Sequence, residues 1–243
     1  MKKRSVLISV LLVILWYFLS RIVQNEFILP SPDIVMRRMV FDIADSNFYY
    51  IVFTSLLRLL KGIIVSLIIG IPLGLAAGLS DKVSDYMQPI NAIIKAVPNM
   101  SYMIILLIWV GAENSVIFVS FFVLFPLVFT NVQMGIKQME QSLKNALRVY
   151  AAPFLTRLKG VYMPQILPQI YSSLKVGCGL GLRVCIMAEV LSQVKVGVGK
   201  QIYFARNILD MSAIFSWTIW MILLSIAMEV ILEKLKFLFK VKD

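Results

Sequence analysis

Few side chains in this sequence could do chemistry, and none of them forms a catalytic arrangement. The 243 residues include no histidine, which is the commonest general base and metal ligand in proteins. No acidic pair and no nucleophile with a base recurs at a useful spacing. We therefore expect no enzyme activity, no metal site and no cofactor in this chain. Cys178 and Cys185 would lie about 10 Å apart on one helix, too far for a disulfide, and we expect them to be small packing residues.

Two charged residues inside an apolar stretch are candidates for a solute path. Arg183 lies near the middle of the stretch 165–194, and Glu189 lies toward its far end. A charge at the middle of a bilayer costs roughly 2.5–3.5 kcal/mol on insertion scales, and it usually faces the bundle interior or a cavity. The two residues fall on different faces of a helix, so we expect no direct pair between them within one chain. Arg183 could line a path for an anion or have a structural role, and the sequence leaves both open.

The elements that would position these residues are membrane-spanning helices. Hydrophobic residues make up 60% of the chain, and its mean hydropathy is +0.86, whereas a soluble domain needs a more charged surface. One span takes roughly 20 apolar residues. The candidate stretches lie within 6–19, 51–79, 89–110, 115–134, 165–194 and 213–232. The sequence therefore predicts an all-α integral membrane protein with about six transmembrane helices.

The basic residues indicate how these spans are oriented. A net charge of +11 would suggest a nucleic-acid partner in a soluble protein, but here the basic residues flank the spans. They are more frequent in the predicted inner segments, so we expect a multi-pass protein of the cell membrane with both termini in the cytoplasm and no nucleic-acid partner. The run 6–19 could instead belong to a cleaved signal peptide, but Trp16, Tyr17 and Phe18 occupy positions that need small residues.

The chain is predicted to have two parts. Residues 1–50 would hold the first span and an external loop with a short amphipathic helix near 34–41. Residues 51–243 would form the membrane core. Its second span carries a stripe of small side chains, which let helix backbones approach closely in lipid, either inside a bundle or between subunits. The stripe consists of Gly62, Ser66, Gly70, Gly74 and Gly78.

The segment 137–164 is the longest polar interval of the chain, and its first half is two-faced at helical spacing. The apolar face consists of Met139, Leu143, Ala146, Leu147 and Tyr150. Pro153 interrupts this helix, and a second short amphipathic segment follows it. Two short basic helices set at an angle are typical of a docking device. The alternative is a loop that only sets topology or rests on anionic lipid headgroups.

This segment resembles the cytoplasmic EAA loop of ABC importer permeases, which carries a Glu-Ala-Ala triplet, then a glycine and later a Leu-Pro pair. The corresponding positions here are Asn145, Ala146, Leu147, Ala151, Met163 and Pro164. Other segments resemble, in the same order, the nitrate/sulfonate/taurine branch of these permeases. They are Leu29-Pro30-Ser31-Pro32, Ser55-Leu56-Leu57-Arg58, Gly70-Ile71-Pro72-Leu73-Gly74, Ala96-Val97-Pro98, Trp109-Val110-Gly111, Ala188-Glu189 and Gly197-Val198-Gly199.

The resemblance implies a type I importer permease with the MetI-like architecture. Two permease subunits, here expected to be two copies of this chain, would pair around a central path. Each would lay its coupling loop, 137–164, on a cytoplasmic ATPase subunit, and an extracytoplasmic solute-binding protein would deliver the solute. The family also implies a small anion as solute, such as a sulfonate, nitrate or carboxylate, or else a vitamin precursor.

Two other classes of protein remain as alternatives at this point. An ion-coupled secondary transporter usually shows internal repeats or mid-membrane carboxylates, and the sequence shows neither convincingly. An intramembrane enzyme or assembly factor is the second alternative. The missing histidine and the lack of a catalytic arrangement argue against an enzyme.

Overall fold

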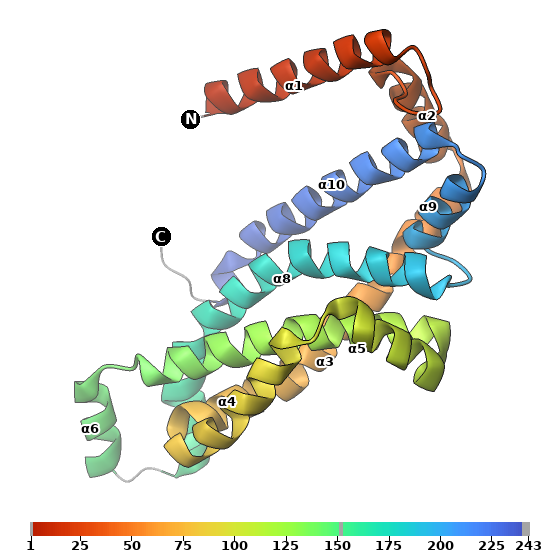
Figure 1. Ribbon diagram of the computed structural model, residues 1–243. Coiled ribbons are helices and arrows are strands. Elements are labelled where there is room, and N and C mark those ends of the chain that lie inside the picture. The colour runs from red at the N-terminus through yellow and green to blue at the C-terminus, as the bar shows by residue number, and fades with distance from the viewer. Residues whose placement is uncertain (1, 151–152, 240–243) are drawn as a thin grey trace.

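The computed structural model describes residues 2–150 and 153–239, and every regular element in those two ranges is a helix. Figure 1 shows their arrangement. In chain order they are α1 (Lys2–Val23), α2 (Pro32–Ala44), α3 (Ser46–Leu79), α4 (Asp81–Ala96), α5 (Asn99–Lys137), α6 (Gln141–Val149), α7 (Phe154–Arg157), the π-helical turn η1 (Leu158–Tyr162), α8 (Met163–Ser192), α9 (Val198–Asn207), α10 (Met211–Lys234) and the 3-10 turn η2 (Lys236–Phe239). The prediction of an all-α protein is confirmed.

Three of these helices, α3, α5 and α10, are long and apolar enough to cross a membrane. The described part of α1 adds a shorter apolar stretch, Val10–Val23. α8 has 30 residues, enough to cross a bilayer, but it includes Lys175, Arg183 and Glu189, which lower its hydropathy. The short amphipathic helix expected near 34–41 is α2. The number of spans beyond these three stays a prediction.

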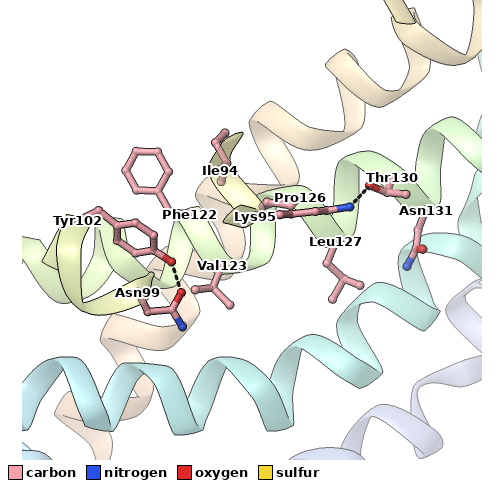
Figure 2. Close-up of a pocket in the computed structure, with 10 residues that line it drawn as sticks. All are labelled: Ile94, Lys95, Asn99, Tyr102, Phe122, Val123, Pro126, Leu127, Thr130 and Asn131. Carbon is pink, nitrogen blue, oxygen red and sulfur yellow. Dashed lines mark hydrogen bonds between the residues drawn. The ribbon is translucent and has the colours of Figure 1, made fainter. Parts of the chain in front are cut away.

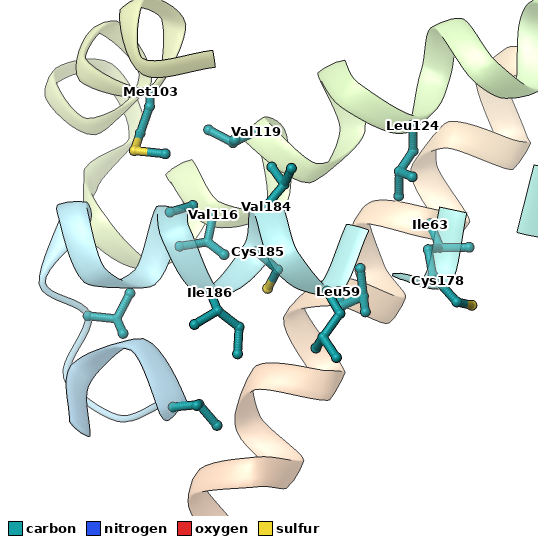
Figure 3. Close-up of a cluster of buried hydrophobic side chains, with 14 of the residues drawn as sticks. Leu59, Ile63, Met103, Val116, Val119, Leu124, Cys178, Val184, Cys185 and Ile186 are labelled. Carbon is teal, nitrogen blue, oxygen red and sulfur yellow. The ribbon is translucent and has the colours of Figure 1, made fainter. Parts of the chain in front are cut away.

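α5 is the central helix of the bundle, and it contacts both α3 and α8. Figure 3 shows the core at this place, where Leu59 of α3, Val116 of α5 and Cys185 of α8 converge. Leu59, Val116 and Cys185 are each 0% exposed. Cys178 and Cys185 are both free and buried, as expected of packing residues.

α5 consists of two helical segments that meet at Gly111, where the backbone has φ 77° and ψ 171°. A positive φ of this size favours glycine, because it lacks a Cβ. Tyr102 in the first segment and Phe122 in the second have ring centroids 5.5 Å apart, whereas a straight helix would separate them by about 30 Å. The chain therefore reverses direction at Gly111, which lies between the predicted stretches 89–110 and 115–134.

A helix, α4, fills the interval between the predicted stretches 51–79 and 89–110, and the second of these stretches is interrupted before Pro98. Ser80 alone separates α3 from α4, and its side chain accepts a hydrogen bond from the backbone N–H of Val83, which caps α4 at once. α4 then ends at Ala96, because Pro98 disfavours helical geometry at the residue before it. Val97 accordingly has extended backbone angles, φ −69° and ψ 126°. Average hydropathy over this stretch does not reveal the break.

The two N-terminal helices lie at one edge of the molecule, and α1 runs away from the bundle in Figure 1. Trp16 of α1 stacks on Phe215 of α10 with ring centroids 5.5 Å apart, and its Nε1 donates a hydrogen bond to the carbonyl oxygen of Pro30. α2 is held to α10 by a hydrogen bond from Ser216 to Asp42. α3 already begins at Ser46, so the boundary predicted after residue 50 falls inside a helix. The division into two domains stays a prediction.

Candidate functional site

The stripe of small residues on α3 faces α5 of the same chain. A Cβ added at Gly74 would lie 2.8 Å from the carbonyl oxygen of Phe129, and one at Gly78 would lie 2.6 Å from the Cβ of Ile136. Real Cβ atoms do not approach other atoms this closely, so both glycines permit backbone contact between the helices. Gly62 and Gly70 are equally close to α5. Ser66 is fully buried, and its Oγ donates a hydrogen bond of 2.8 Å to the carbonyl oxygen of Gly62.

Glu189 of α8 is fully buried and binds Arg58 of α3. Arg58 Nη1 lies 2.6 Å from Glu189 Oε1, and Arg58 Nη2 also pairs with Glu113 of α5. The other carboxylate oxygen, Glu189 Oε2, accepts hydrogen bonds from Ser55 Oγ at 2.8 Å and from the backbone N–H of Gly199 at 2.9 Å. A buried carboxylate is costly unless it is paired and hydrogen-bonded. These contacts therefore join α3, α5, α8 and α9 at one end of the bundle.

The loop from α8 to α9 is built around this carboxylate. A Cβ at Gly197 would lie 2.6 Å from Glu189 Oε2, and one at Gly199 would lie 2.4 Å from the Glu189 Cβ. The backbone N–H of Val198 donates to Ser55 Oγ at 2.9 Å, and that of Lys195 donates to Glu113 Oε1 at 2.9 Å. Both glycines are required here, because a side chain at Gly197 would displace the carboxylate and one at Gly199 would displace the backbone of α8.

Three residues of this cluster were not predicted from the sequence as site residues: Ser55, Arg58 and Glu113. A signal for Arg58 was present, since it is a charged residue within the apolar stretch 51–79, and such residues usually face the bundle interior. The partner could not be found the same way. Arg58 and Glu189 are 131 residues apart in the chain, and a contact at that distance leaves no periodic pattern.

Arg183, the second residue predicted for a solute path, has an exposed side chain on α8. It lines a pocket of about 370 Å3 between α8 and α10, together with Thr218 and Ser225. Glu189 has Arg58 as its ionic partner and belongs to the buried cluster described above. Whether either residue contacts a solute stays a prediction.

α6 projects from the membrane helices at the end of the molecule opposite α9 (Figure 1). Leu143 and Leu147 anchor it, because they pack against the core cluster that contains Met139 and Tyr162. Tyr150, which was predicted to share this packing face, is 82% exposed. That part of the prediction is wrong, because Tyr150 follows the last residue of α6 and lies at the exposed end of this helix.

The positions that correspond to the EAA pattern fall at both ends of this segment. Asn145 is exposed and accepts a hydrogen bond from Gln141 Nε2 at 3.2 Å. Ala146 and Leu147 are half-buried. Ala151 lies outside the described residues. Met163 and Pro164 form the first turn of α8.

Basic side chains surround the base of α6. Lys137, Lys144 and Arg157 line a pocket of about 510 Å3 between α6 and the neighbouring ends of α3, α5 and η1. Lys144 Nζ donates to the carbonyl oxygen of Lys137 at 3.0 Å, and Lys137 Nζ lies 3.6 Å from Asp81 Oδ1. The base of α6 is thus next to three basic side chains and one carboxylate, that of Asp81.

The second short helix predicted for the segment is not a separate element. α7, η1 and α8 form one continuous helical run from Phe154 to Ser192. Pro164 would clash with the carbonyl of Gly160 in a regular α-helix, and it lacks the N–H that this carbonyl needs. The π-helical turn at Leu158–Tyr162 widens the helix at this point. The run therefore continues past the proline into α8.

A pocket of about 300 Å3 lies between the end of α4 and the two segments of α5 (Figure 2). Lys95 Nζ donates to Thr130 Oγ1 at 3.1 Å, and Asn91 Nδ2 donates to the same oxygen at 3.1 Å. The Tyr102 hydroxyl donates to Asn99 Oδ1. The apolar wall of the pocket consists of Ile94, Phe122, Val123, Pro126 and Leu127.

The chain is similar to known transport proteins over most of its length. Residues 70–237 match the family model described as binding-protein-dependent transport system inner membrane component. The chain is 25% identical over 208 residues to the taurine transport system permease protein TauC of Escherichia coli K12, covering 83% of this chain and 75% of that protein. It is 28% identical over 213 residues to the nitrate import permease protein NrtB of a Synechocystis strain, covering 84% of this chain and 76% of that one.

Proposed function

Because this chain belongs to the family of binding-protein-dependent transport system inner membrane components, we propose that α6 is where it meets a cytoplasmic ATPase subunit and that its solute is a small anion. The chain is the membrane-spanning permease subunit of an ABC importer of the nitrate/sulfonate/taurine type and is not itself an enzyme. Members of this family work with an ATPase and a solute-binding protein.

The docking role is supported by the two faces of α6, one packed against the bundle and one exposed. Its inner side is fixed to the bundle by Leu143 and Leu147, while Val149 and Tyr150 are each 82% exposed. A large apolar side chain exposed at the tip of a projecting helix suits a pocket on a partner protein. Movement of α6 would pass to α5 and α8 through the cluster of Met139 and Tyr162.

The orientation and the remaining partners follow from this assignment. α6 and both termini would lie in the cytoplasm, and α9 would lie on the outer side, where the solute-binding protein delivers its cargo. A second copy of this chain would complete the path, and the exposed apolar residues of α1 and α10 would contact lipid or that copy. A small anion agrees with the taurine and nitrate permeases named above. No observation favours the ion-coupled secondary transporter over this assignment.

The docking proposal is tested by crosslinking from the tip of α6. In a background without Cys178 and Cys185, Val149→Cys labelled with a maleimide benzophenone should crosslink to the ATPase subunit when the assembled complex is illuminated. Phe204→Cys on α9, which is 57% exposed at the other end of the molecule, is the matched control and should not crosslink to that subunit.

The same two variants test the orientation. In intact cells a membrane-impermeant maleimide should label Phe204→Cys and leave Val149→Cys unlabelled. The reverse pattern, or equal crosslinking of both variants to the ATPase, would rule out the docking role of α6.

A further inference from the structure

Lys95 is a basic residue that would lie at the depth of the hydrocarbon core if α5 runs near the bilayer normal. Its ammonium group binds Thr130 Oγ1, and Thr130 lies on the second segment of α5, which runs from Gly111 to Lys137. Thr130 is about 28 Å from the first end of this segment and about 10 Å from the second. For a helix near the bilayer normal, that position lies inside the roughly 30 Å thickness of hydrocarbon. A cation at this depth is costly against lipid tails, so it should face a cavity or a path.

The cavity in front of Lys95 offers several hydrogen-bond donors. An ammonium group has three donors, and the bond to Thr130 uses one of them. Thr130 Oγ1 already accepts from Lys95 and Asn91, so its own O–H is a donor. Asn99 Oδ1 accepts from the Tyr102 hydroxyl, which leaves the amide of Asn99 as a donor. Figure 2 shows these groups around one pocket.

The backbone adds positive potential at the same place. α5 begins at Asn99, which lines the pocket, and the residue before it is Pro98, whose side chain cannot accept a hydrogen bond. The first N–H groups of a helix have no partner within the helix, and together with the helix dipole they favour an anion. None of the described residues that line the pocket carries a carboxylate.

The pocket beside Arg183 is less suited to an anion. Gly179 lines that pocket, and a Cβ at this position would lie 3.7 Å from Glu229 Oε1. A carboxylate next to the pocket would repel an anion and offset the attraction of Arg183. Lys95 is therefore the better candidate, although the sequence pattern alone pointed to Arg183.

We propose that the pocket between α4 and α5 is an anion-binding site on the solute path, with Lys95 as its cation and with Asn99 and Thr130 as neutral donors. Its ligand is a small organic anion, such as a short sulfonate or carboxylate, because Phe122, Val123 and Leu127 form an apolar wall opposite the charge. A volume of about 300 Å3 is at the small end of ligand pockets. This inference rests on the proposed transport function, whose solute class it narrows.

The test measures the charge preference of the pocket in the full-length permease, purified in detergent without the ATPase. In a background without Cys178 and Cys185, Leu127→Cys places a thiol on the pocket wall. The rate at which this thiol reacts with an anionic and with a cationic methanethiosulfonate reagent is measured, and each rate is divided by the rate at which the same reagent reacts with free 2-mercaptoethanol. The ratio of the two corrected rates, anionic over cationic, gives the charge preference of the pocket. The anionic reagent should be favoured, and adding Lys95→Gln should lower the ratio of the two rates by about tenfold.

Matched variants show whether the effect comes from the charge of Lys95 itself or from the net charge of the protein. Lys82→Gln removes the same charge from α4 about 20 Å away and should leave the ratio unchanged, whereas Lys95→Arg should preserve it. Ethanesulfonate should protect the thiol from the anionic reagent, and ethanesulfonamide should not. If Leu127→Cys does not fold, Val123→Cys takes its place.

Three results would overturn the inference: a ratio that Lys95→Gln leaves unchanged, an equal loss in Lys82→Gln, or protection by nitrate as good as by ethanesulfonate. The last of these would exclude an organic ligand. The measurement needs neither ATP nor the ATPase, so it tests the pocket separately from transport. If the charge preference depends on Lys95 but the protein shows no ATP-driven uptake, the transport proposal is contradicted and the anion site is not.

Discussion

Arg58 is the residue on which the end of the bundle next to α9 depends. Its guanidinium has two carboxylate partners, and one of these, Glu189, is 0% exposed. A guanidinium suits this place because its N–H donors form a rigid planar fork that reaches two carboxylates in fixed directions, whereas a lysine ammonium is a compact point charge. The pair does not need to contribute net stability relative to an apolar pair, since desolvation offsets much of the attraction. Removing only one partner is different, because an unpaired buried charge remains.

We predict that Arg58→Met destabilises the protein by about 3–5 kcal/mol, since it leaves the Glu189 carboxylate buried without its cation. Adding Glu189→Gln should recover a large part of this loss, because a neutral amide needs no counter-charge. The measurement is thermal unfolding of the purified permease in detergent. The control for this prediction is Arg38→Met.

Arg38 pairs with Asp42 and Asp210, but its side chain is 44% exposed, so its loss should cost no more than about 1 kcal/mol. Equal effects of Arg58→Met and Arg38→Met would contradict the assignment.

At the scale of elements, the contact between α3 and α5 is set by glycines. Gly74→Ala puts a Cβ 2.8 Å from the carbonyl oxygen of Phe129, which is backbone and cannot rotate away. We predict a loss of about 1–3 kcal/mol, the range typical of overpacking, and a larger loss for Gly74→Leu. Gly179→Ala is the matched control, because its nearest contact would be an ordinary 3.5 Å to Ser225 Oγ.

Thermal unfolding of these variants in detergent gives the comparison. Gly179→Ala should unfold within about 0.5 kcal/mol of the parent. If Gly74→Ala behaved like Gly179→Ala, the two backbones would not be in contact at this point, and the stripe would have another role.

The elements that the sequence predicted well are those with a continuous local pattern. α3 and α10 follow from long apolar runs, and α2 follows from its amphipathic spacing after Pro30 and Pro32. The break between α4 and α5 was missed because apolar residues lie on both sides of Pro98, so average hydropathy continues across it. The run from α7 into α8 was missed because Pro164 suggested a break where there is none. A π turn lets the helix continue close to this proline.

The site was harder to predict than the fold, because its residues come from distant parts of the chain. Arg58 meets a carboxylate 131 residues away. The pocket at Lys95 forms only because α4 stops early and α5 reverses at Gly111. Lys95 could not be predicted as a site residue, since nothing in the sequence around it distinguishes it from other basic residues near the ends of spans, such as Lys82.

At the scale of the whole molecule, the contacts group the helices into one body with two attachments. The glycine contacts bind α3 to α5, and the Arg58 cluster binds both to α8 and α9. α6 is attached to this body through Leu143 and Leu147, while α1 and α2 contact it mainly through α10 and the start of α3. The attachment of α6 therefore leads directly to α5 and α8, and α5 is also the helix that carries most of the residues lining the pocket at Lys95.

This arrangement leads to a prediction about Lys95 and Arg183, the two cations that line pockets next to the membrane helices. In proteoliposomes that contain the complete transporter, Lys95→Gln should slow ATP-dependent uptake of an organic anion on the order of tenfold. Arg183→Gln should slow it less, because Glu229 lies beside the pocket that Arg183 lines. Size-exclusion chromatography of both variants shows whether the complex still assembles.

If Arg183→Gln slows uptake more than Lys95→Gln in an intact complex, the solute path runs along α8 and α10 instead of past Lys95. If Arg183→Gln prevents assembly, its guanidinium has a structural role at the contact with a second copy.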